Sequence, residues 1–119
     1  MNQVALVGRI SQQPQLRYTT EGKPYLRFPI AVESDVYDEA TKQYKPDFID
    51  CIIWGKTAET RAPYMNKGLL ISLTGQLRTR IDQNKEGFRY QRTDVRVETL
   101  KFLESKKIVD DRSKQGVLS

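Results

Sequence analysis

Apolar and polar residues alternate along most of this chain, and this period of two constrains the fold more than any other feature of the sequence. Successive side chains of a β-strand point to opposite faces, so each alternating run predicts a strand with one face in a core. Within Leu69 to Arg80, the predicted core positions are Leu69, Ile71, Leu73 and Leu77. The runs are rich in branched and aromatic residues and are separated by glycine and polar turns, which predicts an all-β domain.

Four further segments show the same alternation. They are Gln3 to Ile10, Tyr25 to Val32, Asp47 to Trp54 and Phe88 to Leu103, with a short extension at Leu16 to Thr19. Gly8 is a candidate bulge, Gly75 marks a place where a coiled strand would bend, and Pro29, which lacks an N–H group, is predicted at an edge or a bulge. The polar segments Glu33 to Pro46 and Ile81 to Gly87 are predicted to be loops.

The segment from Thr57 to Asn66 changes to a helical period and is the single helix candidate of the sequence. Thr57 is its predicted N-cap. Pro63 is expected to kink the helix or delay its start, because an interior proline costs about 3 kcal/mol. Strands in this order, with one short helix before the last two, predict an all-β OB-fold, a five-stranded Greek-key barrel.

The composition excludes several classes of function. The 119 residues suffice for one domain, predicted at residues 1–103, followed by a short flexible tail at residues 104–119. Because histidine is absent and Cys51 is the only cysteine, we expect no disulfide, metal site or cofactor. We also expect no enzymatic activity, because no nucleophile with a base and no carboxylate pair stands at a useful spacing. No apolar run reaches the roughly 18 residues of a membrane helix, so we expect a cytoplasmic protein without a membrane partner.

A second set of side chains points away from the predicted core. Cys51 lies on the inner face of Asp47 to Trp54, which places Phe48 and Trp54 on the outer face, about 20 Å apart by the strand rise. Single-stranded nucleic acid needs cations for its phosphates and flat side chains for its unpaired bases, and the net charge of +5 suits a polyanion. The candidate binding residues are Phe48, Trp54, Arg78, Arg80, Phe88, Tyr90, Arg92 and Arg96, with Tyr37 and Lys56 as further candidates.

Five blocks of sequence carry a likeness to a known family. They are VALVGRI followed by Pro14, Leu16, Arg17 and Tyr18, then FPIAV, DFIDCIIWGKTAE, NKGLLISLTGQLRTR and TDVRVETLKFLE. In content, order and spacing they resemble the bacterial and phage single-stranded DNA-binding proteins over about residues 1 to 103. The resemblance implies an OB-fold that assembles as a homotetramer and binds single-stranded DNA, with neither enzymatic activity nor metal. It also places Phe48 and Trp54 where family members stack bases.

The sequence departs from the usual pattern of this family in three places. Val36 and Tyr37 stand where many members have a tryptophan, and no aromatic residue follows Asp82 until Phe88. Typical members also end in an acidic tip that recruits replication and repair enzymes. Residues 104–119 carry no such tip, so we expect no recruitment of replication enzymes by that route.

Two hypotheses follow from the sequence. The first is sequence-nonspecific binding and protection of single-stranded DNA, in association with the nucleoid, during replication, recombination, repair or DNA uptake. The alternative is an OB-fold assembly protein, similar to the replication-restart relatives of the family, whose aromatic face makes subunit or partner contacts. Taken alone, an outward aromatic residue is more often a packing partner than a ligand platform, and surface arginines are usually solvated, so the alternative stays open here.

Overall fold

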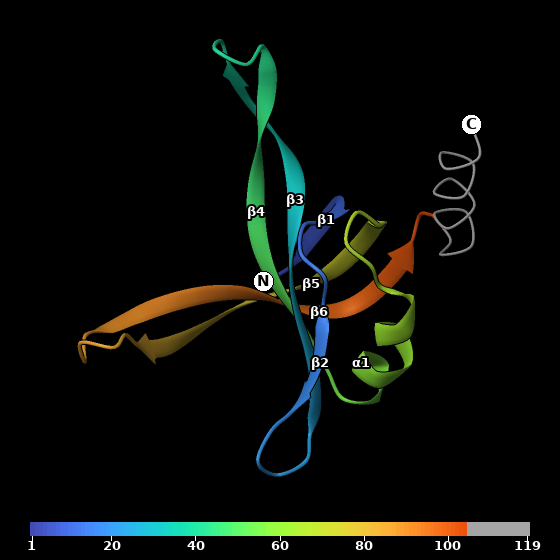
Figure 1. Cartoon of the computed structure of the whole chain (residues 1–119), viewed down its shortest axis with the longest axis vertical. Coiled ribbons are helices and arrows are strands. Elements are labelled where there is room, and N and C mark those ends of the chain that lie inside the picture. Colours follow the sequence, from blue (N-terminus) through green and yellow to red (C-terminus); the bar gives the residue numbers. More distant parts are fainter. Residues whose placement is uncertain (105–119) are drawn as a thin grey trace.

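The structure is a computed structural model that describes residues 1–104, so the predicted tail from residue 105 onward lies outside the described residues. The strands are β1 (Val4–Ile10), β2 (Gln15–Tyr18), β3 (Pro24–Asp38), β4 (Gln43–Trp54), β5 (Leu70–Gln83) and β6 (Arg89–Phe102). One α-helix, α1 (Lys56–Arg61), and one 3-10 helix, η1 (Ala62–Tyr64), lie between β4 and β5. In Figure 1 these helices lie beside the strands.

The strands close into a barrel. Their order in the sheet is β1-β5-β6-β4-β3-β2, and an additional pairing of β1 with β3 joins five of them into a ring. The short β2 pairs with β3 outside that ring. All neighbours are antiparallel except β4 and β6, which run parallel where Cys51 pairs with Val95. This arrangement confirms the predicted OB-fold with five barrel strands, and β2 corresponds to the predicted short extension.

The barrel interior holds the core. Its largest buried side chains come from every strand of the ring, and Phe28, Leu26 and Ile71 have no exposed surface. The parity assigned to β4 is confirmed, because Cys51 and Ile53 belong to this core cluster. The prediction for Leu77 is wrong, because 48% of its surface is exposed where β5 leaves the barrel. At this point alternation continues in the sequence although the strand no longer has a core to face.

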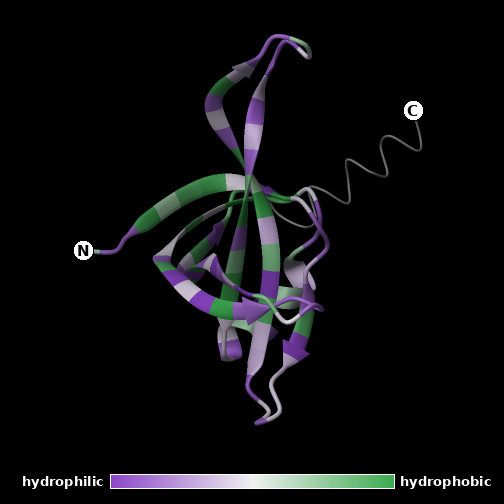
Figure 2. Ribbon diagram, turned by 90° about the vertical axis from the view of Figure 1, so that its left-hand side faces the viewer, coloured by the Kyte–Doolittle hydropathy of each residue, from purple (hydrophilic) through white to green (hydrophobic). Residues whose placement is uncertain are grey.

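Two hairpin arms project from the barrel in different directions (Figure 1). The β3–β4 arm comprises residues 33–47 and the β5–β6 arm residues 78–93, and both remain paired far beyond the barrel. The predicted loop Glu33 to Pro46 is therefore mostly strand, whereas the predicted loop Ile81 to Gly87 is strand only as far as Gln83. Figure 2 shows that the β3–β4 arm, at the top of the view, is largely hydrophilic, whereas hydrophobic residues gather in β1 and in the barrel strands. Both faces of an arm meet water, so the alternation that reveals a strand is missing there.

The helix is shorter than predicted. The α-helix begins after Gly55, whose φ of 79° is left-handed, and no side chain caps it, so Thr57 is not the N-cap. Pro63 was expected to kink the helix or delay its start, but the α-helix instead begins at Lys56 and ends early, at Arg61, and Pro63 lies in η1. A proline fits there because the first residues of a helix donate no intrahelical hydrogen bond.

Gly8 and Pro29 have local roles where β1 and β3 meet. The pairing of β1 with β5 runs through Gly8 without a shift, so the predicted bulge is absent from this pairing. A Cβ atom at Gly8 would instead lie 2.5 Å from the carbonyl oxygen of Ala31, so only glycine allows this close approach. Pro29 lies between the part of β3 that pairs with β2 and the part that pairs with β1, as predicted for a residue without an N–H group.

The thiol of Cys51 is expected to be unreactive in the folded protein. Burial raises its pKa to about 12, with smaller contributions from the carboxylates of Asp50 and Asp94, so the reactive thiolate is scarce at neutral pH. A chromogenic disulfide reagent should titrate no thiol under native conditions and one thiol per chain in urea. Rapid reaction of the native protein would contradict this prediction.

Candidate nucleic-acid interface

The outward side chains of four barrel strands form one continuous surface. In β3 and β4, Tyr25 pairs with Trp54 and Arg27 with Ile52, and paired residues of neighbouring strands share a face. Ile52 also pairs with Arg96 of β6, which links this surface to β5 and β6. We call this surface the outer face. Its residues are Tyr25, Arg27, Phe48, Asp50, Ile52, Trp54, Arg78, Arg80, Arg92, Asp94 and Arg96.

Trp54 lies half-buried at one end of the outer face. Its ring centroid lies 5.2 Å from that of Tyr25, with an interplanar angle of 39°. The ammonium of Lys23 lies over the indole, 4.8 Å from its centroid. The indole therefore packs against its neighbours on the outer face and is not inserted in the barrel core. A side chain that stacks bases must lie outside the core in this way.

A groove of about 300 Å³ opens beside this indole, and we call it the Trp54 groove. Its floor includes Ile52, which is 5% exposed although it lies on the outer side of β4. Arg78 and Arg96 are exposed along its walls and form no ion pair within residues 1–104. The groove thus combines an aromatic ring, an apolar floor and cations, the mixture that suits a nucleotide.

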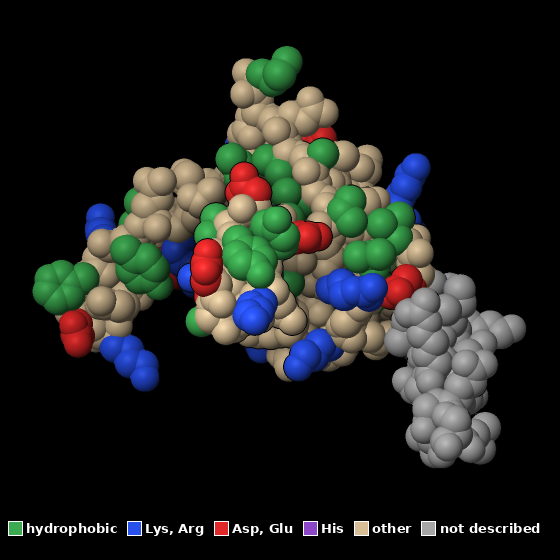
Figure 3. Space-filling view, turned by 90° about the horizontal axis from the view of Figure 1, so that it is seen from above, with side chains coloured by type: hydrophobic (Ala, Val, Ile, Leu, Met, Phe, Trp, Pro, Cys, Tyr) green, Lys and Arg blue, Asp and Glu red, His purple; other side chains and the backbone are tan. Residues whose placement is uncertain are grey.

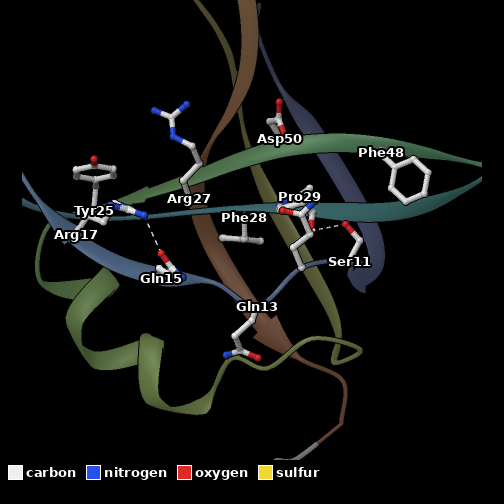
Figure 4. A pocket seen from close by; sticks show the side chains of 11 residues that line it. Ser11, Gln13, Gln15, Arg17, Tyr25, Arg27, Phe28, Pro29, Phe48 and Asp50 are labelled. Carbon is white, nitrogen blue, oxygen red and sulfur yellow. Dashed lines mark hydrogen bonds between the residues drawn. The ribbon is translucent and has the colours of Figure 1, made fainter.

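A second groove of about 940 Å³ lies over β2, β3 and β4, and we call it the Phe48 groove. Figure 4 shows Tyr25, Arg27 and Asp50 projecting from one side of the sheet, and Phe28, which is fully buried, projecting from the opposite side. The Phe48 ring is 68% exposed. Arg27 lines both grooves, so the two grooves meet along the outer face.

A chain of ion pairs crosses the outer face. Arg80 donates from Nε to Asp94 and from Nη1 to Asp82, with both distances 3.1 Å. Arg92 donates from Nη2 to Asp50 at 3.1 Å, and its Nη1 lies 3.9 Å from Asp82. These contacts join β4, β5 and β6 near the base of the β5–β6 arm.

Asp94 is the buried member of this chain. Its side chain is 7% exposed, and Oδ2 accepts from Arg80 and lies 3.7 Å from Nη1 of Arg27. Its other oxygen, Oδ1, is buried and has no hydrogen-bond partner among the described residues. Burial of a carboxylate is costly unless it is paired, so the two arginines are what keep Asp94 in place.

Two members of this chain of ion pairs have shifted pKa values. The hydrogen bond to Asp50 is the largest cause that raises the pKa of Arg92 above its ordinary value. The backbone N–H of Gln83 is the largest cause that lowers the pKa of Asp82, and Arg80 lowers it further. Both groups are therefore charged throughout the neutral range. Within residues 1–104, no cluster of three or more Cys, Asp or Glu side chains could hold a metal ion.

The remaining predicted residues lie on the arms or on α1. Phe88 is 68% exposed in the turn of the β5–β6 arm, and Tyr90, on the same arm, is 43% exposed. Tyr37 lies on the β3–β4 arm, edge-on to Tyr44 with 5.3 Å between ring centroids. Lys56 is exposed at the start of α1 and lines neither groove. The outer face therefore unites six of the ten predicted residues.

Sequence reasoning missed several residues that the structure adds. Arg27 lines both grooves and Arg17 lines the Phe48 groove. Lys23, which the sequence indicated only as a possible phosphate contact, covers the indole of Trp54. A signal for Arg27 was present, because its parity in Tyr25 to Val32 is outward. The pairing of β3 with β4, which brings it beside Ile52, is not contained in the alternation of either strand.

A closed five-stranded barrel with an outer face of this kind defines a small OB-fold binding protein. The chain belongs to the Single-strand binding protein family, which matches residues 1–103.

Named relatives are similar to this chain over most of its length. It is 38% identical to a single-stranded DNA-binding protein of Enterococcus faecalis over 116 residues, 98% of this chain and 61% of the relative. It is 37% identical to single-stranded DNA-binding protein B of Bacillus subtilis over 105 residues, 88% of this chain and 92% of the relative. Protein A of the same species is 38% identical over 106 residues, 89% of this chain and 61% of the relative. The chain thus spans about three fifths of two relatives and nearly all of the third.

Proposed function

We propose that this protein binds single-stranded DNA without sequence preference, by stacking bases on Trp54 and Phe48 and neutralising phosphates with the cations around them. The observation that carries the proposal is the pair of grooves that meet at Arg27, each with an outward aromatic ring. Family membership and the names of the relatives support the same function. Stacking suits any base, because every base has a flat face, so this arrangement favours nonspecific binding.

Site residues beyond the two grooves extend the proposal. Tyr37, Phe88 and Tyr90 are exposed on the arms, where further bases could stack. Arg78 and Arg96 are proposed as phosphate contacts, because both are exposed and free of carboxylate partners within the described part of the chain. Lys56 is proposed as a more distant phosphate contact, since it lines neither groove.

Fluorescence of the single tryptophan tests this function directly. Titration with oligo-dT is expected to quench Trp54, because a stacked base replaces the present environment of the indole. The logarithm of the binding constant should fall with the logarithm of salt concentration, by about 0.7 for each neutralised phosphate. A signal that stays constant, together with no salt-dependent binding in a filter assay, would contradict the proposal.

The second hypothesis, an assembly protein that uses its aromatic face for subunit or partner contacts, is not favoured by the relatives. Sedimentation with and without oligonucleotide separates the two functions. Loss of the oligomer on replacing Phe48, with DNA binding intact, would support the assembly role instead.

We further propose a homotetramer, built on a domain of residues 1–103 and without catalytic activity. The family and the edge of β1 support assembly, since within residues 1–104 β1 pairs with β3 only at Arg9 and Ile10. Val7 of that strand is 54% exposed, and an unpaired strand edge is suited to pairing with another chain. A mass measurement in solution tests the homotetramer, and a monomer at all concentrations would exclude it.

We also propose that the protein acts in replication, recombination, repair or DNA uptake. The described residues contain no helix long and apolar enough to cross a membrane.

A further inference from the structure

The arginines at the base of the β5–β6 arm already use some of the donors that a phosphate would need. A guanidinium recognises phosphate through its fork of N–H groups. In Arg92, one terminal nitrogen donates to Asp50 and the other faces Asp82. In Arg80, Nε and Nη1 are directed to Asp94 and Asp82. A phosphate that binds through these nitrogens must therefore displace a carboxylate or share its donors.

The charges in this part of the outer face cancel. Arg27, Arg80 and Arg92 are the cations of the ion-pair chain, and Asp50, Asp82 and Asp94 are its anions. Figure 3 shows acidic and basic side chains interspersed on one face of the molecule rather than segregated. The centre of the interface thus offers DNA much less positive potential than its arginines alone would produce.

Exposure separates the carboxylates that can exchange from the one that cannot. The side chains of Asp50 and Asp82 are 40% and 35% exposed, and their arginine partners are exposed to a similar degree. Ion pairs this accessible contribute little to stability, so a phosphate can replace them at small cost. The side chain of Asp94 is only 7% exposed, so we do not expect a phosphate to replace it as it could replace Asp50 or Asp82.

We propose that Asp50 and Asp82 compete with DNA phosphates for Arg92 and Arg80, and thereby set the affinity of the interface below the value its arginines would otherwise give. This inference rests on the proposed function. Asp82 is the stronger competitor, because it faces both arginines, whereas Asp50 faces Arg92 alone. The opposite role, in which the carboxylates hold the arginines ready for DNA, predicts the opposite change in affinity.

The test compares Asp82→Asn, Asp50→Asn and the control Asp47→Asn by fluorescence anisotropy with a labelled dT oligonucleotide. Asp47 is an exposed acid on the same strand as Asp50, and it forms no ion pair with the rest of residues 1–104, so its replacement changes the charge equally. At low salt we expect Asp82→Asn to bind about two- to fivefold more tightly than the wild type, the size of an exposed ion pair. Asp50→Asn should gain less, and Asp47→Asn least.

The salt dependence of DNA affinity is a second measurement. A purely structural role of Asp82 would not change it. The gain in Asp82→Asn should shrink as salt increases, because salt weakens the ion pairs that compete in the wild type. Circular dichroism and urea unfolding confirm that each variant folds, and asparagine keeps the shape of aspartate. Equal or weaker binding by both Asp82→Asn and Asp50→Asn, in a wild type that binds DNA, would overturn the inference. Absence of binding by the wild type would instead overturn the proposed function.

Discussion

Replacing Trp54 with alanine is expected to weaken the binding of oligo-dT by about 1 to 3 kcal/mol, the range that one base–aromatic stack contributes. The indole packs on Tyr25 and lies beside a groove with an apolar floor, so alanine removes both the stacking surface and one wall of that groove. Anisotropy of a labelled oligonucleotide measures the loss, since the variant has no tryptophan to report binding.

Phe48→Ala is the companion variant, and it separates binding from folding. The Phe48 ring is 68% exposed, so its removal should leave urea unfolding nearly unchanged while weakening binding by a similar amount. The two rings lie about 20 Å apart along β4, and effects at that distance usually add, so the double variant should lose about 2 to 6 kcal/mol. Tyr64→Ala is the matched control, because Tyr64 is 53% exposed on η1 and lines neither groove. Equal binding by wild type and double variant would exclude the stacking role.

The barrel could be predicted from the sequence because each of its strands buries one face. Alternation in β4 placed Cys51 inside and Phe48 and Trp54 outside, and the structure confirms that parity. The same signal was wrong at Leu77, where apolar residues continue but β5 has left the core. In the arms both faces are exposed, so nothing in the pattern distinguished a paired strand from a loop.

The candidate site was predicted less completely, for a different physical reason. Which side of a strand a residue occupies follows from its parity, but which residues meet depends on the register between strands. Arg92 comes beside Asp50, 42 positions away in sequence, through the packing of β4 against β6. The sequence therefore indicated arginines on the outer face, but not that two of them, Arg80 and Arg92, are paired with carboxylates.

Gly75→Ala is expected to lower the free energy of unfolding by about 3 kcal/mol, because a well-packed site has no room for another carbon. A Cβ atom at Gly75 would lie 2.2 Å from the carbonyl oxygen of Arg96, and a backbone atom cannot rotate away as a side chain can. The strand pairing shifts between Thr74 and Gly75, which agrees with the predicted bend. Because typical domains are stable by only 5 to 15 kcal/mol, roughly, this loss should move the urea midpoint clearly at a fixed protein concentration.

Gly22→Ala is the control for the backbone preference of glycine. Gly22 has a φ of 87°, and apart from Gly22 and its two chain neighbours no atom of residues 1–104 lies within 4 Å of the Cβ position there, so alanine meets strain without a clash. That strain costs about 1 to 2 kcal/mol, less than we expect at Gly75, whose φ lies outside the left-handed range. Because β6 carries both Asp94 and Arg96 past Gly75, the alanine variant should also bind DNA more weakly even where it remains folded. A Gly75→Ala protein as stable as Gly22→Ala would show that the backbone of β6 can move away from Gly75. The close approach of β5 and β6 would then not determine the geometry of the outer face.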